Sequence, residues 1–408
     1  MKIPFSPPYV DETVINEVVD SLRSGWITTG PKVKALEQEI IKLTGTQAAL
    51  GVNSWTSGAL MTLRWWGIQP GDEVIIPAYT YCATAMAPMW AGAKVVMVDS
   101  GTDFNISVDA IRQAITPKTK AIIPVDIAGY PCDYDAIMSL VCEPHIRAMF
   151  KPSSEIQEKM GRILVLSDSA HSIGARYHGK SNGTETDIAV FSLHAVKNVT
   201  TAEGGMICFN MPEPFDNEQL YKEFRLMSLN CQTKDAFTKS QAGGWRYDIV
   251  GKGMKVNMAD INAAIGLAQL RQYDKLLKER HRVYEAYNTA FSACPWAILP
   301  PYRIADRETS CHVYALRVRD FTEQQRDAMI AEIAKHDVAV NVHFVPLPML
   351  SYYKGLGYDI TDYPQAYRNY VNEISLPVYP QLDDEKVNVV IQTVIKAYHS
   401  IKSQTSHQ

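Results

Sequence analysis

The chain has 408 residues with 40 basic and 44 acidic side chains, and 46% of its residues are hydrophobic. This composition excludes a disordered chain and a membrane-embedded one, and the even spread of charge argues against binding to nucleic acid. The length exceeds that served by one hydrophobic core, so we expect a large domain and a smaller one.

The seven cysteines are odd in number, widely spaced and without a C-x-x-C pair. This pattern predicts free thiols in a reducing compartment and no metal site. The N-terminus lacks the apolar run of a signal peptide, and no window of about 18 apolar residues is present to span a bilayer. We therefore expect a cytoplasmic protein that does not contact a membrane.

Two amphipathic helices are predicted first. One follows Asp11, a favoured N-cap, and ends before Gly25. The other begins at Pro31 and ends at Gly45, because proline suits the first turn of a helix and glycine suits its end. The segment GWITTG between them is an irregular loop.

Short apolar segments alternate with longer segments from residue 47 onward. The apolar segments read AALGV, EVIIPA, KVVMVD, KAIIPVD, RILVLSD, AVFSLH and GMICF. Continuous apolar strands are typical of a sheet covered on both faces, and helical connections favour parallel pairing. The pattern predicts a doubly wound α/β domain, in which residues 142–161 form a peripheral insertion without a chemical role.

A long helical pattern begins near residue 258 and runs through INAAIGLAQLRQYDKLLKERHRVYEAY. Apolar segments follow at 312–319 and 338–344, with helices expected over 323–336 and from about 383 to 401. The elements predict an N-terminal arm and large domain over 1–257. A linking helix and a small α+β domain are expected over 258–408.

A phosphate site is possible in VNSWTSGALMTL, where a predicted strand meets a helix. The free N–H groups near Trp55 and Thr56 would face a phosphate at the start of that helix. Simple capping by Ser54 or Thr56 explains the same residues equally well. Neither a P-loop nor a G-x-G-x-x-G motif is present, which disfavours nucleotide hydrolysis and hydride transfer.

Two further segments carry candidate chemical groups. In LSDSAHSIGA, Asp168 ends a predicted strand, where a buried carboxylate either pairs with a cation or caps a helix. His171 alone is more often a core histidine than a catalyst. In FSLHAVKNVTTAEGG, Lys197 follows Ser192 at a strand end, and an enclosed lysine can form a Schiff base. Amine, acid and phosphate cup are the three groups that pyridoxal 5'-phosphate (PLP) requires.

Six ordered segments make the chain resemble the DegT/DnrJ/EryC1/StrS family of sugar aminotransferases, which are PLP enzymes of fold type I. The segments are SLRSGWITTGPKVKALEQEI, PGDEVIIPAYTYCATA, SDSAHSIGA, FSLHAVKNVTTAEGG, GMKVNMADINAAIGLAQL and ISLPVYPQL. The likeness covers nearly the whole chain. It implies a large domain with a mostly parallel sheet covered by helices, a smaller C-terminal α+β domain, and a homodimer with shared active sites.

The resemblance also implies roles for residues around the cofactor. Lys197 matches the lysine that holds PLP as a Schiff base and relays protons. Asp168 matches the carboxylate on the pyridine nitrogen, and His171 lies where the family has a Gln or His near the phenolic oxygen. Tyr81 matches an aromatic residue that stacks on the ring.

Phosphate contacts are implied in the same way. Trp55 and Thr56 by their backbone, and Ser192 by its hydroxyl, match the phosphate cup. Asn257 matches an asparagine that reaches the phosphate bound by the neighbouring subunit.

Two positions depart from the family pattern. Trp55 stands where the family has a small residue, so its indole is expected to reshape the pocket. Asp126 replaces a common His, a departure that bears on the substrate preference. Thr28 and Thr29 of the GWITTG loop are expected to contact the substrate.

The resemblance implies that glutamate donates an amino group to a keto sugar linked to a nucleotide. It favours amination at C4 of a UDP-2-acetamido-2,6-dideoxy-4-keto-hexose for surface polysaccharide biosynthesis. A UDP-4-keto-pentose and a dTDP-linked 3- or 4-keto-6-deoxy sugar are the alternative substrates. Relatives with His in place of the lysine are dehydratases, against which Lys197 argues. A non-catalytic sensor or regulatory protein on the same fold is the alternative of another class.

Overall fold

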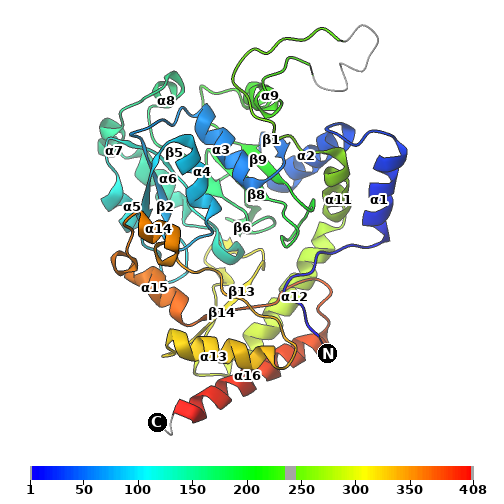
Figure 1. Cartoon of the computed structure of the whole chain (residues 1–408), viewed down its shortest axis with the longest axis vertical. Helices are drawn as coiled ribbons and strands as arrows, with labels where there is room; N and C mark the ends of the chain where they lie inside the picture. Colours follow the sequence, from blue (N-terminus) through cyan, green and yellow to red (C-terminus); the bar gives the residue numbers. More distant parts are fainter. Residues whose placement is uncertain (1, 235–244, 406–408) are drawn as a thin grey trace.

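The computed structural model describes residues 2–234 and 245–405. Figure 1 shows an upper part built around one large sheet and a lower part that contains a smaller sheet and the C-terminal helix. The N-terminal arm lies against the lower part, where the N–H of Ile3 donates to the carbonyl of Asp337 at 2.8 Å. No helix in these two ranges is both long and apolar enough to cross a membrane.

The two predicted N-terminal helices are confirmed. Helix α1 (Glu12–Arg23) begins after Asp11, whose side chain accepts a hydrogen bond from the N–H of Val14. Helix α2 (Pro31–Thr44) ends at Gly45, which has φ of 76°. Glycine adopts this left-handed conformation without steric cost, so the sequence stops the helix there.

The large sheet has seven strands in the order β1-β9-β8-β5-β4-β2-β3. The pairs β2 with β3, β2 with β4, β4 with β5, and β5 with β8 are parallel. Each predicted apolar segment contributes one strand. The strands are β1 (Ala48–Val52), β2 (Glu73–Pro77), β3 (Lys94–Val98), β4 (Thr119–Ile122), β5 (Leu164–Asp168), β8 (Ile188–Ser192) and β9 (Gly205–Phe209).

Strand β9 departs from the expected parallel pattern, because it is antiparallel to both β1 and β8. The connection from β8 to β9, over residues 193–204, contains no helix. A chain that returns without a helical crossover pairs antiparallel with the strand it has just left. The sheet is therefore mostly parallel with one reversed strand.

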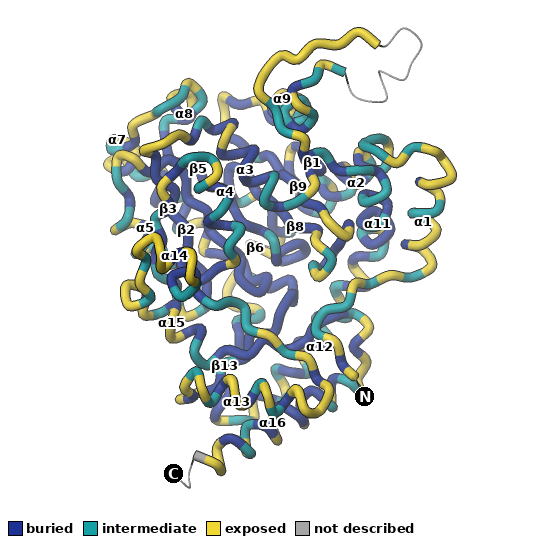
Figure 2. The backbone as a smooth tube through the Cα atoms, in the orientation of Figure 1, coloured by how far each residue is buried: buried dark blue, intermediate teal, exposed yellow. Residues whose placement is uncertain are grey.

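Helices cover both faces of this sheet, as the continuous apolar strands require. Alternate residues of β9 show the division: Ile207 packs in the cluster that contains α3 (Trp55–Trp65), whereas Met206 packs with α2 and α11 (Asp260–Leu270). Figure 2 shows the buried strands between these layers. The other helices of this part are α4 (Ala83–Ala91), α5 (Val108–Ala114), α6 (Tyr134–Cys142) and α9 (Asn217–Ser228), with a 3-10 turn at Ile127–Gly129.

The insertion at residues 142–161 forms two short helices, α7 (Pro144–Met149) and α8 (Glu155–Met160). Figure 1 places both at the upper edge of the molecule, away from the centre of the sheet. The Oγ of Ser154 donates to the carbonyl of Trp66 at 3.0 Å, which fastens α8 to the end of α3. The insertion is peripheral, as expected.

The smaller sheet is antiparallel and consists of β10 (Ala297–Ile298), β13 (Tyr314–Val318) and β14 (Glu373–Leu376). Helices α12 (Tyr273–Ser292), α13 (Glu323–Ala334) and α16 (Asp384–Thr405) belong to the same α+β unit. Segment 338–344 forms isolated bridges rather than a strand, because its backbone pairs first with Ile3 and then with Ser375. The domain boundary at 257/258 stays a prediction.

The remaining elements connect the two parts. Strands β6 (Arg176–Tyr177), β7 (Lys180–Ser181), β11 (Arg303–Ile304) and β12 (Arg307–Glu308) form a small antiparallel sheet that joins segments far apart in the chain. Helices α14 (Ser351–Gly355) and α15 (Pro364–Val371), with 3-10 turns at Leu347–Met349 and Ile360–Asp362, complete the fold. Residues of β13 and α15 join the main core cluster, so the two parts share apolar contacts.

Candidate active site

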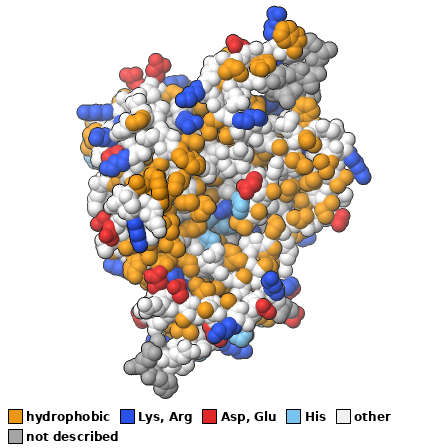
Figure 3. Space-filling view, viewed as in Figure 1, with side chains coloured by type: hydrophobic (Ala, Val, Ile, Leu, Met, Phe, Trp, Pro, Cys, Tyr) orange, Lys and Arg blue, Asp and Glu red, His pale blue; other side chains and the backbone are white. Residues whose placement is uncertain are grey.

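A cavity of about 460 Å³ opens at the strand ends of the large sheet. Figure 3 shows it as a hollow with histidines at its centre. The predicted residues that line it are Trp55, Thr56, Tyr81, Asp168, His171, Ser192 and Lys197. The tertiary structure thus brings together seven residues from four separate segments.

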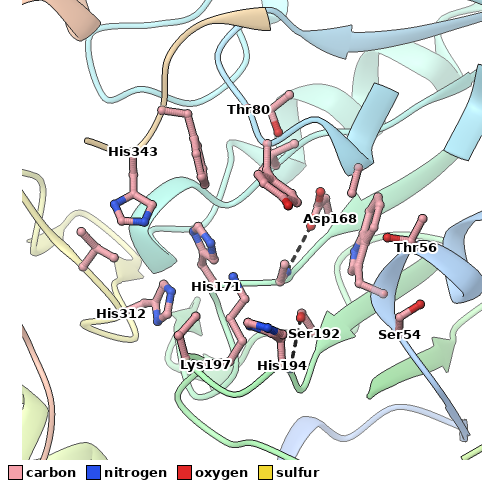
Figure 4. Close-up of a pocket in the computed structure, with 18 of the residues that line it drawn as sticks. Ser54, Thr56, Thr80, Asp168, His171, Ser192, His194, Lys197, His312 and His343 are labelled. Carbon is pink, nitrogen blue, oxygen red and sulfur yellow. Dashed lines mark hydrogen bonds between the residues drawn. The ribbon is translucent and has the colours of Figure 1, made fainter. Parts of the chain in front are cut away.

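Lys197 follows β8 and points into this cavity (Figure 4). Its backbone N–H donates to the carbonyl of His194 at 2.9 Å, which holds the turn that carries it. Removal of water by the surrounding protein lowers the pKa of its amine to about 8, and the nearby Asp168 opposes this shift. A lysine with such a pKa has a substantial neutral fraction near neutral pH and can act as a nucleophile.

Asp168 ends β5 and is only 4% exposed. Its Oδ2 accepts a 2.8 Å hydrogen bond from the hydroxyl of Thr84, and its Oδ1 accepts one of 3.2 Å from the N–H of Ala170. Burial raises the pKa of this carboxyl to about 7. A cationic group in the cavity would restore the ionised form, since an opposite charge lowers the pKa of an acid.

Helix α3 points its N-terminus at the cavity. Ser54 caps the helix by accepting a 3.0 Å hydrogen bond from the N–H of Ser57, so the simple capping interpretation holds for this residue. The N–H groups of Trp55 and Thr56 belong to the first turn, where a helix offers no internal acceptor. Capping and anion binding are therefore compatible here.

Gly205 lets strand β9 lie close to the first turn of α3, and this contact shapes the candidate phosphate site. A Cβ at Gly205 would lie 2.5 Å from the carbonyl carbon of Ser54 and 2.7 Å from the nitrogen of Trp55. Any larger residue would push β9 away from the start of α3. The hydroxyl of Ser192, at the end of the neighbouring β8, lines the same side of the cavity.

Histidines from the small unit complete the cavity, and sequence reasoning missed them. His312 and His343 both line it, and the rings of His171 and His312 lie 4.3 Å apart. Burial lowers the pKa of His171 and His312 well below the usual range and that of His343 to about 4, so all three are neutral imidazoles. No motif around His312 or His343 signalled a site, because each belongs to an ordinary apolar segment, 312–319 or 338–344.

Tyr81 lies at the mouth of the cavity with 59% of its side chain exposed. Its ring centroid is 5.9 Å from that of Phe344, another lining residue that sequence reasoning missed. Such exposure leaves one face of the ring open for a flat partner.

Asn257, Thr28 and Thr29 do not line this cavity. The Nδ2 of Asn257 donates to the Oγ1 of Thr29 at 2.6 Å, and the carbonyl of Thr28 accepts from the N–H of Asp260. Thr29 and Asn257 line a separate small depression beside α2. Substrate contact by Thr28 and Thr29 within this chain's own cavity is therefore not observed, and their role stays a prediction.

Asp126 is fully buried behind the cavity instead of lining it. It accepts five hydrogen bonds, from Cys132 N–H at 2.9 Å, Tyr134 Oη at 2.6 Å, Ser172 Oγ at 2.6 Å, Asn182 Nδ2 at 2.8 Å and, at 3.5 Å, Ser169 Oγ. The oxygens of Asp126 are thus used by the surrounding protein, as a buried carboxylate requires.

Trp55, the other departure, is also enclosed. Its indole is 5% exposed, lines the cavity, and leaves Nε1 without a hydrogen-bond partner among the described residues. The indole forms part of the cavity wall and presents a donor there, and whether it reshapes the pocket stays a prediction.

An enclosed lysine, a buried carboxylate and a helix N-terminus around one cavity fit PLP, which has a carbonyl, a ring nitrogen and a phosphate. A mostly parallel sheet covered by helices, with a second α+β unit at the cavity, defines the class of PLP enzymes of fold type I. The chain belongs to the DegT/DnrJ/EryC1/StrS aminotransferase family, whose sequence profile matches residues 8–395. Members of this family use PLP, which confirms the expected cofactor.

Individual relatives extend the likeness over the whole chain. The putative sugar aminotransferase Spr1654 of Streptococcus pneumoniae, solved in a PMP-form, is 43% identical with a TM-score of 0.94 over 100% of both chains. Its PLP-form has a TM-score of 0.93 over 98% of this chain and 100% of that one. The spore coat polysaccharide biosynthesis protein SpsC of Bacillus subtilis is 34% identical over 96% of both chains. The uncharacterized protein MJ1066 of Methanocaldococcus jannaschii is 36% identical over 96% of this chain and 97% of its own.

Proposed function

We propose that this protein transfers an amino group from glutamate to C4 of a keto sugar linked to UDP. The preferred substrate is a UDP-2-acetamido-2,6-dideoxy-4-keto-hexose, and the product serves surface polysaccharide biosynthesis. The observation that carries the proposal is that Lys197 and Asp168 face one cavity beside the N-terminus of α3. The sugar-aminotransferase name of Spr1654 and the polysaccharide role in the name of SpsC support the substrate class.

The residues around the cavity have distinct proposed roles. PLP, when bound, supplies an electron sink at its protonated ring. Lys197 holds the cofactor covalently and moves protons through its amine. Asp168 keeps the ring nitrogen protonated, since a nearby negative charge favours the cationic form. His171, a neutral imidazole, would contact the cofactor, and Tyr81 would stack on its ring.

The phosphate is held by the first turn of α3. The N–H groups of Trp55 and Thr56 and the hydroxyl of Ser192 would donate to its oxygens. Because Asn257 lies outside this chain's cavity, we propose that it completes the phosphate site of a second copy. The active unit would then be a homodimer, in which the partner copy contributes Asn257 and the loop with Thr28 and Thr29.

The experiment that tests the function offers the purified enzyme glutamate and each candidate sugar nucleotide in turn. Mass spectrometry should detect an amino sugar only from the UDP-linked 4-keto-2-acetamido hexose, and the Lys197→Ala variant should form none. Amination of only a UDP-4-keto-pentose or of a dTDP-linked sugar would refute the substrate and leave the transaminase activity intact. Absence of any amino transfer from glutamate would refute the activity itself.

A further inference from the structure

Strand β14 carries two buried polar residues that point the same way. Glu373 and Ser375 are both 0% exposed, and they share a face because side chains alternate along a strand. The hydroxyl of Ser375 donates to Oε1 of Glu373 at 2.5 Å. Neither residue lines the cavity, so the pair lies behind the side chains that form the cavity wall.

His343 connects this pair to the cavity. Its Nδ1 lies 2.9 Å from Oγ of Ser375, and its backbone N–H donates to Oε2 of Glu373 at 3.1 Å. The same imidazole lines the cavity (Figure 4). Nδ1 is occupied by Ser375, so Nε2 is the nitrogen that remains for a group in the cavity.

The protons in the hydrogen bonds that join Glu373, Ser375 and His343 have two consistent arrangements. A hydroxyl has one proton and can donate once while it accepts. When Glu373 is ionised, Ser375 donates to it, Nδ1–H donates to Ser375, and Nε2 has a free lone pair. When Glu373 is protonated, it donates to Ser375, and Ser375 donates to Nδ1. The proton of the imidazole is then on Nε2. The two arrangements differ by one proton shifted along each hydrogen bond.

Three other histidines line the cavity. Nε2 of His194 lies 3.7 Å from a carboxylate oxygen of Glu203, which is exposed rather than buried, and His312 and His171 have no carboxylate partner in the described part of the chain. Nδ1 of His312 lies 2.9 Å from Oδ1 of Asn198, whose Nδ2 donates to the carbonyl of Ser310. An amide oxygen accepts a hydrogen bond but does not take up a proton near neutral pH. Nδ1 of His171 has no partner among the described residues. Of these four imidazoles, His343 alone leads to a buried carboxylate within the described ranges.

We propose that His343, Ser375 and Glu373 form a proton relay that takes one proton from the ammonium group of Lys197. The N–H bond of Lys197 breaks as Nε2–H forms on His343. Nδ1–H then passes to Ser375, and the Ser375 proton passes to Glu373. The products are a neutral amine and a neutral carboxylic acid, no electrons are exchanged, and the reverse sequence returns the proton. The inference rests on the proposed role of Lys197 as the reactive amine.

Electrostatics agree with this geometry. Burial raises the pKa of Glu373 to about 8 and lowers that of Lys197 to about 8. The two shifts bring the pKa values of the acid and the amine toward each other, which favours exchange of a proton between them. The cationic groups that act on Glu373 are Arg326 and Arg317, which both lower its pKa. The phenol of Tyr79 donates to the carbonyl of His343 at 2.5 Å and so fixes the backbone of the relay.

The tautomer of His343 tests the relay directly. In full-length protein labelled with ¹⁵N-histidine, the proton of His343 should move from Nε2 to Nδ1 as pH rises through about 8, where Glu373 titrates. Glu373→Gln should hold the Nε2–H form throughout, and Ser375→Ala should abolish the coupled exchange. Glu37→Gln is the matched control: Glu37 is also buried with a pKa of about 7, does not line the cavity, and its variant should keep the exchange.

Turnover gives the second readout. Glu373→Gln should lower kcat by about 100-fold or more, the usual contribution of a positioned acid-base group, and leave KM for the keto sugar unchanged. A single His343 tautomer across the titration of Glu373 would overturn the relay, as would normal turnover in Glu373→Gln. The half-reaction with glutamate alone gives the same kinetic test, so failure of the proposed sugar substrate is distinguishable from failure of the relay.

Discussion

Thr84 donates a 2.8 Å hydrogen bond to Oδ2 of Asp168, which joins helix α4 to the end of strand β5. The contact satisfies one oxygen of a buried carboxylate and favours its ionised form. Hydrogen bonds to charged groups contribute about 1.5–3 kcal/mol. We expect Thr84→Val to raise the dissociation constant for PLP by about ten-fold, as measured by absorbance titration. Thr84→Ser retains the hydroxyl and should bind PLP as the wild type does.

Asp168→Asn should slow transamination by about ten-fold or more, even at saturating cofactor. The carboxylate favours a protonated ring nitrogen by about one to three pKa units, and an amide does not. Steady-state kinetics with glutamate as donor measure the effect. Turnover close to the wild type would show that Asp168 does not act on the ring.

Attachment of PLP to the cofactor-free protein should accelerate as pH rises through about 8, the pKa of Lys197. The neutral amine is the reactive form, and its fraction grows as pH increases through the pKa. An ordinary lysine, with a pKa of about 10.4, would show this rise only at higher pH. Trapping with borohydride at a series of pH values measures it. Lys197→Ala should trap no cofactor in the cavity, whereas the control Lys180→Ala, at an exposed position on β7, should trap it normally.

Mixing two defective variants tests whether Asn257 serves the neighbouring subunit. Lys197→Ala removes the reactive amine from one subunit, and Asn257→Ala removes the proposed phosphate contact from the other. In a mixed dimer, one site has both intact residues and should regain tight PLP binding and turnover. Light scattering should show a dimer for each variant and for the mixture. A monomer that is active at assay concentration would contradict the shared site.

Asp126→Ala should destabilise the protein rather than change its substrate preference. Each buried polar group left without a partner costs about 1–3 kcal/mol, and the substitution strands the donors of Tyr134, Ser172 and Asn182. Chemical denaturation should therefore show a loss of at least about 3 kcal/mol. Asp126→Asn, which keeps one acceptor oxygen, should lose less. If the variant had normal stability but an altered sugar preference, Asp126 would act on the substrate rather than on the stability of the fold.

Local patterns allowed much of this structure to be predicted. Asp11 and Gly45 marked helix ends, because caps depend on residues within one turn. Lys197 and Asp168 stood out because a charged group next to an apolar strand needs a chemical reason. The resemblance then joined these separate groups to one cofactor and one family. The comparisons confirm the family and its cofactor, and the roles of the individual residues stay predictions.

Contacts between distant segments decided the rest. The reversal of β9, the burial of Asp126 and the approach of His343 to the cavity each depend on chain segments that pack together only in the folded protein. Glu373 and His343 are 30 residues apart in sequence, yet the backbone N–H of His343 donates to Oε2 of Glu373. The amino-acid sequence by itself determined which elements form and which groups can react. Only the tertiary structure decided which of these groups meet, because burial and hydrogen-bond partners arise from long-range packing rather than from local periodicity.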